Sequence, residues 1–158
     1  MYGQMDVRED KEERTMVKEM HHIGLCVTNM EEMTKFYEGV LGLKKVTDIT
    51  MKGKFLDTVQ GKSQMDYWIV KYETINGIII ELLQDRGHEV KPQTENSLQA
   101  AGLRHFAFLV DDVDEKYREI KEMGYETISG PCTSEDGSMR LFFVRDPEMN
   151  LVEIMQLY

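Results

Sequence analysis

Two glutamates lie inside apolar stretches, where a carboxylate is unexpected. Glu81 lies within GIIIELLQ and Glu153 within NLVEIMQ. A buried carboxylate is costly unless it is paired or bound to a metal. Two histidines begin other apolar stretches, His22 in HIGLCV and His105 in HFAFLV. Two imidazoles and two carboxylates suit a divalent transition-metal ion and leave two adjacent coordination positions for water or substrate.

These four residues occupy equivalent positions of an internal repeat. The segments after His22 and His105 share one order: histidine, apolar run, helix cap and acidic first helical turn. Aligning the last strands of the two halves places Glu81 on Glu153. One strand histidine or glutamate is more often a structural residue, but the same pair in both halves favours one metal site built from two halves. His21 is the local rival of His22 and does not match His105 in the repeat.

The elements that must position these residues form one strand–helix–strand–strand–strand unit in each half. A cap residue, an acidic residue three positions later and a closing glycine delimit each helix. The predicted strands are 20–27, 43–51, 66–73 and 78–83, then 103–110, 125–129, 139–145 and 151–157; the predicted helices follow Asn29 and Asp112 and stop at Gly42 and Gly124. The pattern predicts an α+β fold with a flexible charged leader (1–19), a first module (20–83), a linker (84–101) and a second module (102–158). Residues 52–64 are predicted as a polar loop over an opening.

Composition excludes several classes of function. The chain has 158 residues and a formal net charge of −10, which opposes nucleic acid or an anionic membrane as a partner. No apolar run reaches the roughly 18 residues that a membrane span needs. The two cysteines, Cys26 and Cys132, are far apart, which favours a reduced, cytoplasmic setting.

In these features the chain resembles the vicinal oxygen chelate superfamily, which includes glyoxalase I, methylmalonyl-CoA epimerase, extradiol dioxygenases, fosfomycin-modifying enzymes and bleomycin-resistance proteins. The resemblance covers residues 20–158 and rests on HHIGLCVTNMEEMTKFYEGVLGL, GIIIELLQ, GLRHFAFLVDDVDE and FFVRDPEMNLVEIMQ. It implies two βαβββ modules that form a half-open curved barrel around one divalent ion (Zn, Ni, Co, Mn or Fe). The ligands implied are His22, Glu81, His105 and Glu153.

The resemblance implies a glyoxalase I-like (lactoylglutathione lyase-type) isomerase or lyase. The substrate would be a small molecule, a thiol hemiacetal or an acyl thioester, that chelates the ion through two adjacent oxygens and reacts through an enediolate. Glu153 or Glu81 is the expected base, and a homodimer is expected. The family arginine that holds glutathione is absent from Leu25-Cys26-Val27, so the thiol carrier stays open.

Three alternatives remain from the sequence. A methylmalonyl-CoA epimerase-like enzyme would use lysines of the first module to hold phosphates, although a solvated lysine-rich loop is the simpler interpretation of Lys44, Lys45, Lys52, Lys54 and Lys62. A metal-dependent dioxygenase would require oxygen, and a non-catalytic small-molecule-binding or resistance protein would not require metal. In the family that the chain resembles, the last turn usually carries a glycine, which tolerates positive φ. Met149 stands at that position here, so a strained or altered turn is expected.

Overall fold

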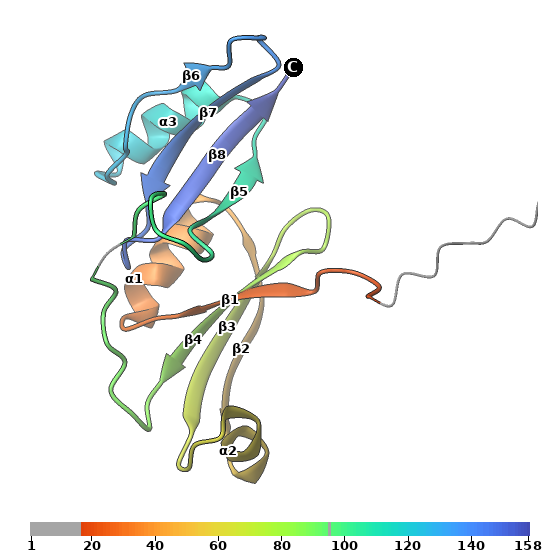
Figure 1. Ribbon diagram of the computed structural model, residues 1–158, viewed down its shortest axis with the longest axis vertical. Coiled ribbons are helices and arrows are strands. Elements are labelled where there is room, and N and C mark those ends of the chain that lie inside the picture. Colours follow the sequence, from red (N-terminus) through yellow and green to blue (C-terminus); the bar gives the residue numbers. More distant parts are fainter. Residues whose placement is uncertain (1–16, 95) are drawn as a thin grey trace, which may run out of the picture.

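Two four-stranded sheets, one from each half of the chain, organise the computed structural model (Figure 1). The structure describes residues 17–94 and 96–158, so most of the predicted leader, residues 1–16, lies outside the described residues. The first half contains β1 (His22–Cys26), α1 (Met30–Thr34), η1 (Lys35–Val40), β2 (Lys44–Lys52), α2 (Lys54–Gln60), β3 (Asp66–Glu73) and β4 (Ile79–Asp85). The second half contains β5 (His105–Leu109), α3 (Val113–Glu122), β6 (Cys132–Thr133), β7 (Met139–Arg145) and β8 (Leu151–Leu157).

The two sheets have the same strand order, β1-β4-β3-β2 and β5-β8-β7-β6. In each sheet the first strand pairs parallel with the last strand, and the other pairs are antiparallel. The sheets do not close into a barrel. The α+β fold and the duplication predicted from the sequence are therefore confirmed, with an open arrangement of the two curved sheets.

The helix caps lie where the sequence placed them. Asn29 accepts a hydrogen bond from the backbone N–H of Glu32 at 3.1 Å, and Asp112 accepts one from that of Glu115 at 2.8 Å. These contacts satisfy backbone donors that have no partner in the first helical turn. The first helix widens to π-helical geometry over Lys35–Val40 before it ends.

Two predicted elements differ from the structure. The predicted loop 52–64 contains helix α2, because Leu56 is buried against Met65, Tyr67 and Ile69. The predicted strand 125–129 is reduced to an isolated bridge at Thr127, and the edge strand β6 forms further along the chain.

The reason for the second difference is local. Residues 125–129 exchange two backbone hydrogen bonds with β7, from the N–H of Ile128 and to the carbonyl of Glu126. Gly130 and Pro131 then interrupt the ladder, since proline has no N–H to donate.

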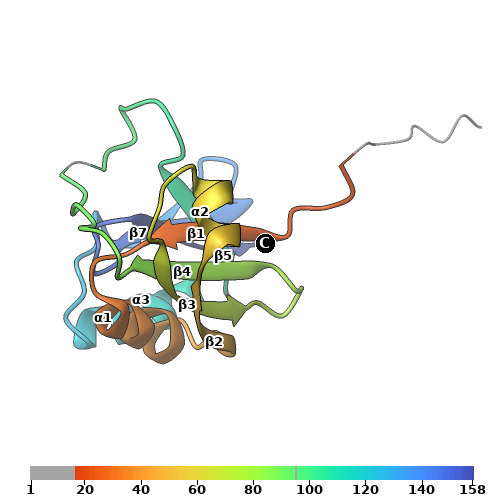
Figure 2. The same ribbon diagram turned by 90° about the horizontal axis from the view of Figure 1, so that it is seen from below.

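Both modules share one hydrophobic core, to which the helices of both halves contribute. Phe36 of η1 contacts Tyr125 of the second module, with ring centroids 5.0 Å apart, and Tyr37 stacks on Phe106 at 6.5 Å. The core includes the helix-facing residues of both sheets. Figure 2 shows α1 and α3 on one side of the sheets and α2 on the other. Among the described residues, no helix is long and apolar enough to cross a membrane.

Candidate functional site

His22 and Glu81 form an imidazole–carboxylate pair on the first sheet. The Nε2 atom of His22 lies 3.6 Å from Oε2 of Glu81. The parallel register places Gly24, two residues after the histidine, beside Glu81. A side chain at Gly24 would meet Leu83 at 3.2 Å and Glu81 at 3.8 Å, so glycine preserves the space beside this pair.

His105 and Glu153 form the equivalent pair on the second sheet. Nε2 of His105 lies 3.2 Å from Oε2 of Glu153. Ala107, two residues after the histidine, is in register with Glu153, as Gly24 is with Glu81. The two halves thus present the same donor atoms at the same positions, each beside a small residue, as the internal repeat predicts.

The two pairs remain separate within one chain. Strand alternation directs Ile23 and Phe106 toward the shared core and leaves the neighbouring histidines, His22 and His105, on the opposite faces. Each histidine side chain is 42% exposed, whereas the two carboxylates are 11% and 12% exposed. Across residues 17–94 and 96–158 of a single chain, no three His, Cys, Asp or Glu side chains form a group that could hold a metal ion. The structure therefore brings the four predicted ligands together as two pairs.

A lysine distinguishes the first histidine–glutamate pair from the second. Nζ of Lys71, on β3, lies 2.8 Å from Oε1 of Glu81, opposite the oxygen that faces His22. The corresponding position beside Glu153 is Phe143, whose ring meets that of His105 edge-on at 5.5 Å. Lys71 was not among the site residues predicted from the sequence, although a lysine inside the apolar strand segment WIVKY is a signal comparable to that of Glu81.

His21 contacts its neighbour, the predicted ligand His22. The Nδ1 atoms of the two rings are 2.8 Å apart, so one of them donates and the other accepts. This contact occupies Nδ1 of His22 and leaves its Nε2 as the nitrogen that faces Glu81. When Nδ1 of His22 is the donor, this hydrogen bond orients its ring, as a second N–H bond orients a metal-binding imidazole.

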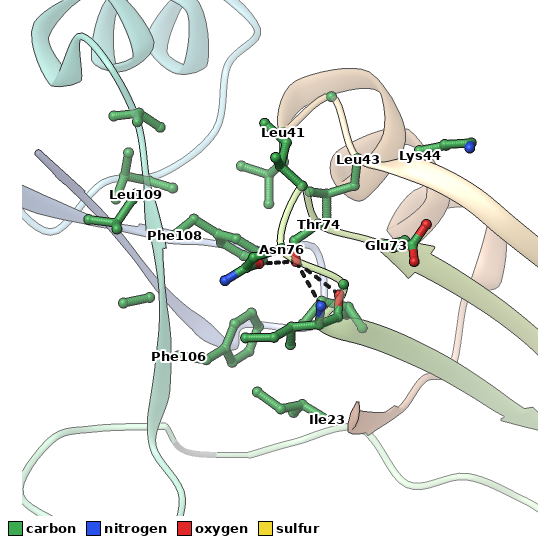
Figure 3. Close-up of a pocket in the computed structure, with 18 of the residues that line it drawn as sticks. Ile23, Leu41, Leu43, Lys44, Glu73, Thr74, Asn76, Phe106, Phe108 and Leu109 are labelled. Atoms are coloured by element: carbon green, nitrogen blue, oxygen red, sulfur yellow. Dashed lines mark hydrogen bonds between the residues drawn. The ribbon is translucent and has the colours of Figure 1, made fainter. Parts of the chain in front are cut away.

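An apolar cavity of about 800 Å³ lies between the modules. Phe106 and Phe108 of β5 face Thr74 and Asn76 of the β3–β4 hairpin across this cavity (Figure 3). None of the four predicted ligands lines it. Ala107, which is in register with Glu153, does line it, so the cavity borders the second histidine–glutamate pair.

Some of the lysines considered as a phosphate-binding patch in the first module have other contacts. Nζ of Lys45 lies 3.4 Å from Glu38 and 3.7 Å from Asp48, and Lys44 lines the apolar cavity. These contacts agree with the interpretation of the lysines as solvated or locally paired residues.

Comparisons with known proteins agree with this fold. Over 145 residues the chain is 27% identical to the uncharacterized protein YwkD of Bacillus subtilis, which covers 89% of this chain and 98% of YwkD. It is 27% identical over 135 residues to the uncharacterized protein YaeR of Escherichia coli, with 84% and 91% covered.

Solved structures share the architecture at lower identity. A glyoxalase family protein from Bacillus cereus superimposes with a TM-score of 0.80 at 21% identity and covers 92% of this chain and 97% of that one. The trypanothione-dependent glyoxalase I of Leishmania major superimposes with a TM-score of 0.59 at 19% identity, with 89% and 87% covered.

The family model of the Glyoxalase/Bleomycin resistance protein/Dioxygenase superfamily matches residues 19–154. This match spans both modules and includes all four predicted ligands. With the duplicated βαβββ fold, it shows that the chain belongs to the Glyoxalase/Bleomycin resistance protein/Dioxygenase superfamily.

Proposed function

We propose that this protein is a metal-dependent isomerase or lyase of the glyoxalase I type, whose site is completed by a second copy of the chain. The observation that carries the proposal is the equivalence of the two half-sites. His22 with Glu81, and His105 with Glu153, present one imidazole nitrogen and one carboxylate oxygen each. In the proposed homodimer, the first pair of one chain meets the second pair of the other.

The exposed faces of the sheets support assembly between two chains. Helices α1, η1 and α3 contribute to the shared core, and α2 covers part of the ligand-bearing face of the first sheet by packing Leu56 on Tyr67 and Ile69. The rest of the ligand-bearing faces exposes apolar side chains. Apolar residues on these faces, Ile49, Leu109 and Leu157, are 43%, 66% and 56% exposed. A two-fold axis would cover both faces at once and create two identical sites.

The residues present fit a divalent ion. Imidazole and carboxylate donors suit zinc, nickel, cobalt, manganese or iron, and each carboxylate is largely buried beside a half-exposed imidazole. When bound, the ion supplies Lewis acidity that stabilises negative charge on two adjacent substrate oxygens. The remaining chemistry falls to side chains of this protein.

Glu153 is the proposed base. Its carboxylate takes the proton as the substrate C–H bond breaks, and the electron pair of that bond passes to the neighbouring carbonyl group. Glu153 then returns the proton to the adjacent carbon, which is isomerisation, or to the same carbon, which is epimerisation. Glu81 is the less suitable base because Lys71 already occupies its Oε1.

The test begins with the metal content of the purified protein and its turnover of methylglyoxal with glutathione under anaerobic conditions. We expect a bound divalent ion, product formation that a chelator abolishes, and deuterium exchange from solvent at the reacting carbon. Glu153→Gln should retain much of the metal and lose at least about 100-fold in turnover, because it removes the base. Full activity of Glu153→Gln would show that the base is another group.

Other results would favour the alternatives. Activity with an acyl-CoA instead of the thiol hemiacetal would favour the epimerase, and oxygen uptake would favour the dioxygenase. Tight binding of a drug or metabolite by the metal-free protein would favour a binding or resistance protein.

A further inference from the structure

We propose that the apolar cavity between the modules is a second ligand site, which takes an uncharged aromatic molecule with one hydrogen-bond acceptor. Its volume of about 800 Å³ lies within the roughly 300–1,000 Å³ of small-molecule sites in proteins. The four predicted metal ligands do not line it, and Ala107 marks where it borders the second histidine–glutamate pair. Binding in this cavity therefore needs no metal and does not depend on the proposed function.

Two aromatic side chains of β5 form one wall of the cavity. Phe106 and Phe108 meet edge to face, with ring centroids 5.8 Å apart. Both pack against the shared core and are still partly exposed, so each ring has surface left for a ligand. An aromatic ligand gains offset or edge-to-face contacts with such rings in addition to the burial of apolar surface.

Asn76 supplies a polar contact with a defined direction. Its Oδ1 accepts a hydrogen bond from the hydroxyl of Thr74 at 2.6 Å, which assigns the amide nitrogen to the other side of the group. Figure 3 shows this nitrogen directed toward the side of Phe106 and Phe108. Because an amide N–H only donates, the ligand that fits carries an acceptor, such as a carbonyl oxygen, beside the aromatic wall.

The charged residues of the lining are balanced by opposite charges. Lys44 stands opposite Glu73 in the register of β2 and β3, and both lie on the side of the cavity away from Phe108 (Figure 3). Nζ of Lys116 lies 2.5 Å from Oε2 of Glu119. Among the described residues of the lining, a charged ligand would thus lose its hydration without gaining a free counter-ion. An uncharged ligand is the class that we assign.

The neutral fluorescent ketone prodan tests the site in the full chain after treatment with a chelator. Its emission should shift to the blue and saturate at one molecule per chain. Naphthalenes that carry an acetyl, ethyl or carboxylate group at the same ring position then compete with it. Acetylnaphthalene should bind at least about tenfold more tightly than naphthoate, because the carboxylate finds no free cation. Tighter binding of naphthoate, or no saturable binding of prodan, would overturn the proposal.

Two leucine variants locate the binding. Leu109 and Leu157 are 66% and 56% exposed and lie on the faces that meet in the proposed homodimer, but of the two only Leu109 lines the cavity. Leu109→Asp should weaken prodan binding by at least about tenfold, and Leu157→Asp by less than about twofold. An equal loss in both variants would assign the binding to the exposed faces and overturn the cavity as the site.

Asn76→Asp tests the hydrogen bond to the ligand, because it keeps the acceptor for Thr74 and removes the donor. The variant should bind acetylnaphthalene at least about fivefold more weakly, the size of one hydrogen bond, and change the affinity for ethylnaphthalene by less than about twofold. Equal effects on both compounds would show that no acceptor is recognised at Asn76.

A second copy of the chain is the other candidate occupant of the cavity. Sedimentation of the same solutions measures self-association. Prodan binding that persists when the chains are fully associated would support a small-molecule site. Binding that disappears as the chains associate would show that another chain covers the cavity, and would overturn the proposal.

Discussion

Glu148 of the second module caps the strand–helix junction of the first by binding Thr28. One carboxylate oxygen, Oε1, accepts hydrogen bonds from the backbone N–H of Thr28 at 2.6 Å and from its hydroxyl at 2.7 Å. The same oxygen accepts a third bond from the N–H of Asn29 at 2.9 Å. The turn that precedes β8 therefore fixes the end of β1, and with it the strand that carries His22.

This contact predicts a large effect of Glu148 on stability. Glu148→Ala leaves three donors without their acceptor and should lower the free energy of unfolding by about 1–3 kcal/mol. Glu148→Gln keeps one acceptor oxygen and should cost less. Urea unfolding followed by circular dichroism measures both, and Glu135→Ala, at an exposed residue, should change stability by less than about 0.5 kcal/mol. Equal stability of Glu148→Ala and the unaltered protein would show that the junction is held by other contacts.

The buried pair of Tyr37 and Asp146 predicts a pH-dependent effect. The hydroxyl of Tyr37 donates to Oδ2 of Asp146 at 2.9 Å, and the residues are 0% and 2% exposed. Burial raises the pKa of Asp146 above 3.8, while hydrogen bonds from Asn150, Tyr37 and Glu148 act to lower it. Tyr37→Phe removes one of these bonds and should cost about 1–3 kcal/mol at neutral pH.

The sign of the pH dependence follows from that raised pKa. A carboxyl whose pKa is raised by folding stabilises the protein at low pH. This contribution to the free energy of unfolding is lost as the pH increases from 3.8 through the pKa of the folded state. Tyr37→Phe raises the folded pKa of Asp146 further, so the deficit of the variant should be smallest near pH 3.8 and grow to a constant value above the folded pKa. A deficit that shrinks with increasing pH over this range would contradict this assignment of the hydrogen bond.

Met149 predicts a stabilising substitution. Its φ is +67°, in the left-handed region that disfavours side chains. A strained turn was predicted here because Met149 stands where related proteins usually have glycine. The side chain is 43% exposed, so little packing is lost on its removal. Met149→Gly should raise the free energy of unfolding by about 0.5–1 kcal/mol. Met149→Ala keeps the β-carbon and should not raise the free energy of unfolding. Equal effects of the two substitutions would show that the change comes from loss of the side chain beyond the β-carbon and not from relief of backbone strain.

Much of the fold could be predicted because local signals agree with it. The caps at Asn29 and Asp112 and the strands 66–73, 139–145 and 151–157 depend on neighbouring residues, and the structure has them there. The equivalence of His22 with His105 followed from the repeat, because both halves have the same strand register. Helix α2 was missed because its short segment shows one buried apolar residue, Leu56, which is not a helical pattern.

The arrangement of the half-sites could not be predicted because it depends on contacts between distant residues. The packing of Phe36 against Tyr125 and of Tyr37 against Phe106 joins the helix faces of the two modules. Neither contact has a periodic signal in the sequence. The ion pair of Lys71 with Glu81 likewise depends on the alignment of β3 with β4.

Complementation between two inactive variants tests most directly whether one metal site is shared by two chains. One variant carries His22→Ala with Glu81→Gln, and the other carries His105→Ala with Glu153→Gln. Each variant alone should lose the ion, because every site in its homodimer lacks one half. Co-expression should create mixed dimers in which one of the two sites is intact, giving about one ion per four chains when the subunits mix at random. Metal bound to the unaltered protein but absent from the mixed dimers would contradict a site shared between two chains.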